Sequence, residues 1–174
     1  ASALFLCPTF GQGDIDSRLE VFLVKQRAAD GVLETEQLSE GNRILDEIST
    51  KVISSAELKN KRYLDLLKIV GRARVRQWRG LSAGPGGRAE EMLSNRIQGS
   101  LRLRISPVFK DKLRSEVLLF PDLYDTDLRA GAAIFLGELE DESSTLALLN
   151  ATRDLDRDVR DCAAEAVIGR DSSA

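Results

Sequence analysis

Apolar residues recur along most of this chain at the three- and four-residue spacing of a helix. In the first such segment the recurring positions are Ile15, Leu19, Phe22 and Leu23. The pair Asp30-Gly31 follows them, and this turn signal predicts that the first helix ends there. The same period predicts a second helix over 35–54 and a third over 55–79.

The third predicted helix carries the clearest apolar stripe. Its face consists of Tyr63, Leu66, Leu67, Val70 and Ala73, and we expect Trp78 to extend it into the core. After this helix, residues 80–87 contain four glycines and one proline. Such a composition disfavours any regular element, so we predict a linker over 80–87.

The segment 88–105 begins with a helical pattern but ends in 101–105, where apolar and basic residues alternate as in a strand. No other segment offers a strand partner, and a lone strand would leave its backbone groups unpaired, so we predict helix. Pro107 suits the first turn of the next helix. The stripe of that helix consists of Phe109, Leu113, Val117 and Phe120.

Two stretches near the end of the chain, 125–139 and 156–170, are alike at an offset of 31 residues. The identical positions are Asp125/Asp156, Asp127/Asp158, Arg129/Arg160, Ala132/Ala163 and Ala133/Ala164. Aspartates accept hydrogen bonds from the free N–H groups of a helix start, and paired alanines let neighbouring helices approach closely. We expect the arginine to reach a neighbouring turn or an aspartate of the adjacent unit.

This shared pattern resembles the HEAT repeat, in the short form of about 30 residues found in phycobilisome lyases and many scaffold proteins. The likeness covers about residues 122–170. Its structural positions are Asp127, Arg129, Ala132, Ala133, Asp158, Arg160, Ala163 and Ala164. The resemblance implies a short α-solenoid. One unit cannot bury its own face, so we expect the upstream helices to complete the stack.

Together these observations predict an all-α fold, in which a helical array or bundle runs into a short HEAT-like α-solenoid. We divide the chain into an extended apolar arm (1–13), a helical region (14–105) that contains the linker, and the repeat region (106–174).

Charge is unevenly distributed, although the whole chain carries only −3. Residues 1–58 carry net −5, residues 59–114 net +11 and residues 115–174 net −9. The positive middle can pair with the two negative ends, or it can face an acidic partner protein. In the second case, the predicted partner-binding residues are Leu4, Phe5 and Phe10 of the arm, with Lys61, Lys68, Arg72, Arg76 and Arg79 of the third helix.

The composition narrows the chemistry. Histidine is absent, which excludes Ser-His-Asp and Cys-His nucleophile pairs within this chain. Two cysteines are too few for a four-cysteine zinc or iron–sulfur site, and we expect Cys7 and Cys162 to be free thiols. We therefore predict no catalytic, cofactor-binding or metal-binding residue. No uncharged run reaches the ~18 residues of a membrane span, although the protein could join a membrane peripherally through a complex.

These features favour a non-catalytic scaffold or adaptor that docks on other protein subunits, since HEAT arrays offer extended binding surfaces. The resemblance implies a photosynthetic complex, and a start at Ala1 rather than Met fits removal of a transit peptide. As the location of the protein we expect the chloroplast first and the cytoplasm second.

The resemblance also implies an alternative function, that of a bilin lyase or chromophore chaperone subunit. Another alternative is anion or nucleic-acid binding by the basic helix 59–79, but the chain is acidic overall and lacks interleaved aromatic residues, which disfavours nucleic acid.

Overall fold

The computed structural model describes residues 15–28, 34–50, 56–81, 85–139 and 141–171. Within these ranges every regular element is helical, which confirms the predicted all-α class. The α-helices are α1 (Ile15–Ala28), α2 (Thr35–Thr50), α3 (Ala56–Trp78), α4 (Pro85–Arg104), α5 (Pro107–Lys112), α6 (Thr126–Glu138), α7 (Thr145–Ala151) and α8 (Arg157–Asp171). A π turn, η1 (Leu113–Val117), continues α5, and a 3-10 turn, η2 (Glu142–Ser144), leads into α7.

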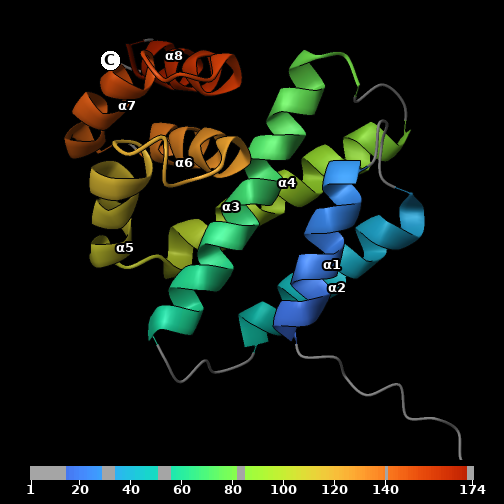
Figure 1. The fold of residues 1–174 in the computed structure, drawn as a ribbon. Coiled ribbons are helices and arrows are strands. Elements are labelled where there is room, and N and C mark those ends of the chain that lie inside the picture. The colour runs from blue at the N-terminus through green and yellow to red at the C-terminus, as the bar shows by residue number, and fades with distance from the viewer. Residues whose placement is uncertain (1–14, 29–33, 51–55, 82–84, 140, 172–174) are drawn as a thin grey trace, which may run out of the picture.

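Helices α1 to α4 form the N-terminal part of the molecule, with α1 and α2 on the right of Figure 1 and α3 and α4 crossing its middle. Helix α1 packs on α2 and α3, and α4 packs on α2 and α3. The space between these helices is filled by large apolar side chains, among them Phe22, Leu45, Leu67 and Ile97, all of which are buried. Burial of such side chains is the main favourable term in forming the core.

Helix α4 corrects the predicted linker and resolves the strand-like pattern at 101–105. It begins at Pro85, so 85–87 form its first turn instead of belonging to a linker. Proline is suited to this place because the first N–H groups of a helix have no helical acceptor. At the other end the helix runs through Arg104, and the Ile105 N–H still donates to the Leu101 carbonyl at 2.9 Å. This stretch is therefore helix, as predicted.

The C-terminal helices stack beside α3 in two layers (Figure 1). Helices α3, α6 and α8 follow one another in one layer, while α5, η1 and α7 form the other. Ser106 starts the second layer, because its hydroxyl accepts a hydrogen bond from the Phe109 N–H at 3.2 Å, with Pro107 in the first turn as predicted. The arrangement is compatible with an α-solenoid.

Helix α6 is enclosed by its neighbours, and every residue from Leu128 to Leu136 is buried. It meets α3 where Gly131 faces Gly71. A Cβ atom added to Gly131 would lie 1.9 Å from the Leu67 carbonyl oxygen, and one added to Gly71 would lie 2.0 Å from the carbonyl oxygen of Asp127. No side chain fits at either position, so the two backbones are in direct contact.

Two aromatic residues depart from the predicted stripes. Trp78 was expected to extend the core face of α3, but 40% of it is exposed. Phe120 was expected to complete the stripe of the helix that begins at Pro107, but it lies beyond η1 and is half exposed. Trp78 is the last residue of α3, and Phe120 follows the end of η1, so both rings lie where helical packing stops.

Candidate interaction surfaces

Three of the predicted contact residues, Lys61 and Lys68 of α3 and Arg79 just beyond its end, are paired with carboxylates of the same chain. Lys61 Nζ lies 3.2 Å from Glu20 of α1. Lys68 Nζ lies 3.3 Å from Asp125 and 3.5 Å from Asp65. Arg79 donates to Asp158 of α8 at 2.5 Å. Arg72 is half-buried on the same helix. The charges predicted to face an acidic partner therefore also contribute to the fold.

The same pattern extends beyond α3, so that the positive middle of the chain closes on both negative ends. Toward the N-terminal segment, Arg62 of α3 donates to Asp16 at 2.5 and 3.1 Å. Toward the C-terminal segment, Arg74 pairs with Glu165 at 3.3 Å. Three further arginines outside α3 make similar pairs: Arg96 with Asp46, Arg102 with Glu138 and Arg114 with Asp141. Of the two alternatives left by the sequence, internal pairing is the one observed for these groups.

Arg76 is corrected as a contact residue, because it is only 1% exposed. Its guanidinium lies between α3 and α4, with Nη1 3.3 Å from the Glu90 carboxylate. Gln26 of α1 donates to the same carboxylate oxygen at 3.1 Å. This buried polar cluster joins three helices of the N-terminal part. The arm residues Leu4, Phe5 and Phe10 lie outside the described residues.

The repeated aspartates and arginines occupy equivalent places in the C-terminal stack. Asp125 accepts a hydrogen bond from the Leu128 N–H at 2.9 Å, and Asp156 accepts one from the Asp158 N–H at 2.8 Å. Both caps were predicted. The side chains of Arg129 and Arg160 each turn back to backbone carbonyls of the loop that precedes their own helix. These acceptors are Pro121 and Tyr124 for Arg129, and Asp154 and Leu155 for Arg160.

Arg129 also makes the predicted contact with an aspartate beside the second unit. Its Nε and Nη2 donate to the two carboxylate oxygens of Asp154, both at 2.9 Å, and the pair is almost completely buried. The same guanidinium bonds the Pro121 carbonyl at 2.9 Å. One side chain therefore holds the loop before α6 beside the loop before α8.

The repeated alanines are packed inside the stack. Ala132, Ala133 and Ala163 are fully buried, whereas Ala164 is partly exposed. Helices α6 and α8 also approach closely at Gly137, where an added Cβ would lie 2.4 Å from the Cβ of Ala166. We did not single out Gly71, Gly131 or Gly137 from the sequence. The signal available there was a glycine within an otherwise apolar helical stripe.

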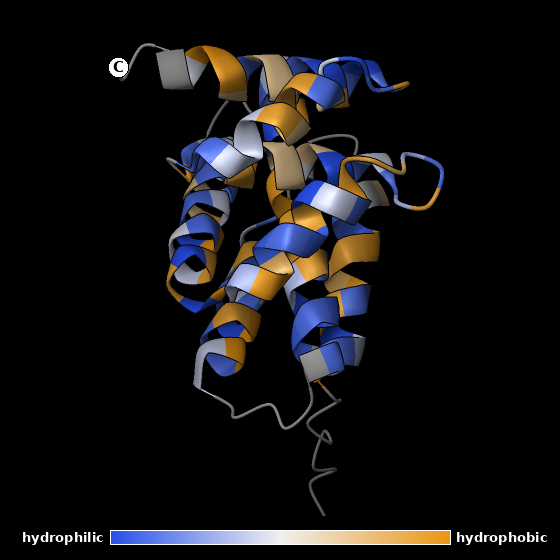
Figure 2. Ribbon diagram, turned by 90° about the vertical axis from the view of Figure 1, so that its left-hand side faces the viewer, coloured by the Kyte–Doolittle hydropathy of each residue, from blue (hydrophilic) through white to orange (hydrophobic). Residues whose placement is uncertain are grey.

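Large apolar side chains are exposed on the two loops that Arg129 joins. Leu123 is 73% exposed in the first loop, and Leu155 is 75% exposed in the second. Both loops project from the same side of the stack in Figure 2, and each carries hydrophobic segments. We name the exposed apolar side chains of these two loops the apolar edge and define it as Leu119, Phe120, Leu123 and Leu155.

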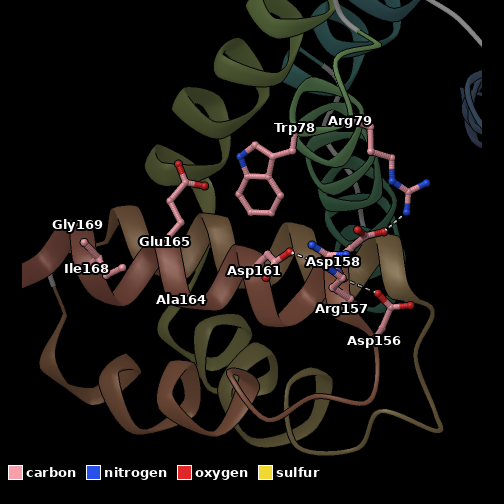
Figure 3. A pocket seen from close by; sticks show the side chains of 10 residues that line it. All are labelled: Trp78, Arg79, Asp156, Arg157, Asp158, Asp161, Ala164, Glu165, Ile168 and Gly169. Carbon is pink, nitrogen blue, oxygen red and sulfur yellow. Dashed lines mark hydrogen bonds and ion pairs between the residues drawn. The ribbon is translucent and has the colours of Figure 1, made fainter.

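A groove of about 900 Å³ lies between the end of α3 and the outer face of α8. Figure 3 shows the Trp78 indole facing α8, with the side chain of Glu165 on one side of it and that of Asp161 on the other. Arg79, Asp156, Arg157 and Asp158 line one end, and Ile168 and Gly169 line the other. The groove is open to solvent.

Cys162 is a buried free thiol in α8, as predicted. Burial raises its pKa to about 12. The thiol therefore stays protonated at neutral pH and is a poor nucleophile. Cys7 lies outside the described residues.

Within the described ranges, no helix combines the length and the apolarity that crossing a bilayer requires. Comparison of the chain with family models, with curated proteins and with solved structures found no match.

Proposed function

We propose that this protein is a non-catalytic adaptor that docks on another protein through the apolar edge. The observation that carries the proposal is the exposure of large apolar side chains on two loops that a buried ion pair holds side by side. Exposed apolar patches on a folded protein are typical of interaction sites, because contact with a partner removes their surface from water. The aromatic ring of Phe120 supplies the kind of residue that is enriched at interface centres.

The construction of the edge supports docking rather than a passive surface. Arg129 contacts the backbone of the first loop and the side chain of Asp154 in the second, so both loops are fixed before any partner arrives. A preformed surface loses less conformational entropy on binding, which strengthens association for a given contact area.

The resemblance of 122–170 to short HEAT repeats supports the same proposal, because such arrays present surfaces to other proteins. In this proposal the protein serves as a subunit of a larger assembly, and the resemblance points to a photosynthetic complex of the plastid. The docking surface differs from the contact set expected from charge, since Lys61, Lys68 and Arg79 already have carboxylate partners within the chain.

Site-specific photo-crosslinking in a native extract tests this proposal. A photoreactive residue is placed at Leu123 or at Leu155, and at Leu103 of α4 as a control that is 87% exposed. We expect the two edge positions to label the same protein, identified by mass spectrometry, and the control position not to label it. An antenna protein identified in this way would favour the chromophore-chaperone alternative.

A paired variant completes the test. Leu123→Glu with Leu155→Glu should abolish the labelled complex, while Leu103→Glu should leave it intact. All variants should keep the helical circular dichroism of the parent, because the substituted side chains are exposed. Equal labelling from all three positions, or a complex that survives the double substitution, would contradict the proposal.

A further inference from the structure

The groove between Trp78 and α8 has the composition of a site for a positively charged side chain. Its lining contains the carboxylates of Asp156, Asp158, Asp161 and Glu165, against the guanidinium groups of Arg79 and Arg157. Acidic groups therefore outnumber basic ones. The indole adds a flat π face, which attracts cations that approach within about 6 Å of the ring centre.

The two central carboxylates, Asp161 and Glu165, are each about half exposed, and their ion pairs within the chain are long. Arg157 lies 3.5 Å from Asp161 one turn away on α8, and the arginine side chain is 84% exposed. Glu165 is half exposed, and its partner Arg74 lies 3.3 Å away. Exposed ion pairs of this kind contribute little to stability, so an incoming cation can replace them at small cost.

Asp158 differs from these two carboxylates, because it is held by Arg79 at 2.5 Å and is mostly buried. Asp156 accepts from the Thr126 hydroxyl at 3.2 Å and from the Asp158 N–H at 2.8 Å. These bonds fix the end of the groove near the start of α8. The available acceptors are therefore Asp161 and Glu165, on either side of the indole (Figure 3).

The remaining lining favours a polypeptide over a free small cation. Between the two carboxylates the α8 surface carries the small residue Ala164, and beyond them it carries the exposed side chain of Ile168. The groove thus offers a hollow for a long side chain and an apolar contact beside it. A helical or extended segment with one basic and one apolar residue on the same face matches both features.

We propose that this groove binds a basic segment of a partner protein, with a lysine or arginine side chain stacked on Trp78 and paired with Asp161 and Glu165. This inference goes beyond the proposed adaptor function, because the groove and the apolar edge are lined by different side chains. The expected partner also has the opposite charge. The basic third helix predicted an acidic partner, whereas this groove fits a basic one.

The protein carries its own reporter, because Trp78 is its only tryptophan. The full chain is titrated with a synthetic amphipathic peptide that bears lysine and arginine on one face and leucine on the other. A matched peptide with glutamate in place of each basic residue serves as the control. We expect a saturable change in Trp78 fluorescence with the basic peptide only. The change should disappear at 1 M salt, where the Debye length falls to about 3 Å.

Charge-neutralising variants locate the binding site. Asp161→Asn with Glu165→Gln should weaken binding of the basic peptide about five-fold, since two exposed pairs are removed. Glu57→Gln with Glu142→Gln makes the same change in net charge at exposed positions outside the groove and should leave affinity unchanged. Equal affinity of the two variants would overturn the proposal, as would the absence of a saturable signal.

The edge variant separates this proposal from the adaptor proposal. Protein with Leu123→Glu and Leu155→Glu should bind the basic peptide as the parent does, because neither leucine lines the groove. If the edge variant keeps peptide binding but no crosslinked partner is found, only the adaptor proposal fails. If the crosslinked partner is found but the groove variant binds the peptide like its control, only the groove proposal fails.

Discussion

Between α1, α2 and α4 neighbouring helices are separated by side chains such as Phe22 and Leu93, whereas α6 meets α3 and α8 through glycine. Both regions contain buried helices, but the first fills its spaces with large groups that have several rotamers. The second has backbone against backbone at Gly71 and Gly131. A side chain can shift by a few tenths of an ångström, but a packed backbone transmits any displacement to the whole helix. The same small change should therefore have different effects in the two regions.

The largest expected effect comes from one substitution made in both regions. Gly131→Ala should lower the free energy of unfolding by about 3 kcal/mol or more, because the new methyl group would collide with the Leu67 carbonyl. Gly41→Ala should change it by less than about 1 kcal/mol, since alanine is the better helix former. At Gly41 the new Cβ would lie 2.9 Å from Leu93 Cδ2 and from ring atoms of Phe22, and both groups can move. Urea unfolding followed by circular dichroism measures the free energy of unfolding of both variants. Similar losses of stability would show that the two regions do not differ in their tolerance of an added methyl group.

The next effect concerns the buried ion pair of the C-terminal stack. Arg129→Met should destabilise the protein by about 3 kcal/mol, because it leaves the Asp154 carboxylate buried without its cation. Adding Asp154→Leu should recover part of this loss. Arg160→Met is the matched control at the equivalent position of the second unit and should cost only about 1 kcal/mol, since Arg160 bonds to two neutral carbonyls.

Thermal unfolding of the three variants provides the measurement. If Arg160→Met proves as harmful as Arg129→Met, the two units depend equally on their arginines and the loops of the apolar edge have no special anchor.

A smaller effect is expected in the N-terminal part, where Arg62 forms a hydrogen-bonded pair with Asp16. The guanidinium of Arg62 holds the pKa of the Asp16 carboxyl below its ordinary value. A carboxyl with a lowered pKa in the folded state stabilises the fold above its unfolded pKa, and this stabilisation is lost as the pH falls through the folded value. Asp16→Asn should therefore cost about 1 kcal/mol at pH 7, and this cost should shrink as the pH falls below the ordinary aspartate pKa of about 3.9 and vanish once the folded carboxyl is protonated.

Asp46→Asn is the control for this pH dependence, because the Asp46–Arg96 pair is largely exposed. Its effect at pH 7 should be close to zero. Stability measured by urea unfolding from pH 7 to pH 3 gives both profiles. If both variants lose the same stability at every pH, the Arg62–Asp16 pair contributes no more to stability than an exposed pair.

The smallest expected effect has the opposite sign. Gly99 lies in α4, and an added Cβ would meet no atom within 4 Å. Gly99→Ala should therefore raise the stability by about 0.5–1 kcal/mol, through helix propensity alone. A rise in Tm of a few degrees measures it. A loss of stability at Gly99 would mean that glycine contributes to this fold by something other than close helix approach.

The helices themselves could be predicted because their apolar period is a local property of the chain. The caps at Asp125 and Asp156 and the reach of Arg129 to Asp154 were also predictable, since each acts within or beside its own repeat unit. The predicted linker over 80–87 was wrong from Pro85 onward. The prediction followed the glycine content of this segment, whereas the preference of proline for a first helical turn decides where α4 begins.

What could not be predicted depends on which helices meet. Arg76 follows Lys68 and Arg72 on a helical wheel, and only the docking of α4 and Glu90 against α3 makes it a buried residue. Trp78 continues an apolar stripe, but it is the last residue of α3 and lies where helical packing stops. The groove and the apolar edge therefore needed the three-dimensional arrangement.

The closure of the positive middle on both acidic ends has a consequence for synthesis. Arg74 and Glu165 are 91 residues apart in the chain, and Arg79 and Asp158 are 79 apart. Proteins emerge from the ribosome N-terminus first, at about 5–20 residues per second. Helix α3 therefore leaves the exit tunnel with its N-terminal carboxylates already made and its C-terminal ones still untranslated. During those seconds the nascent chain is cationic beside an anionic ribosome, and translation of the last helices restores its balance.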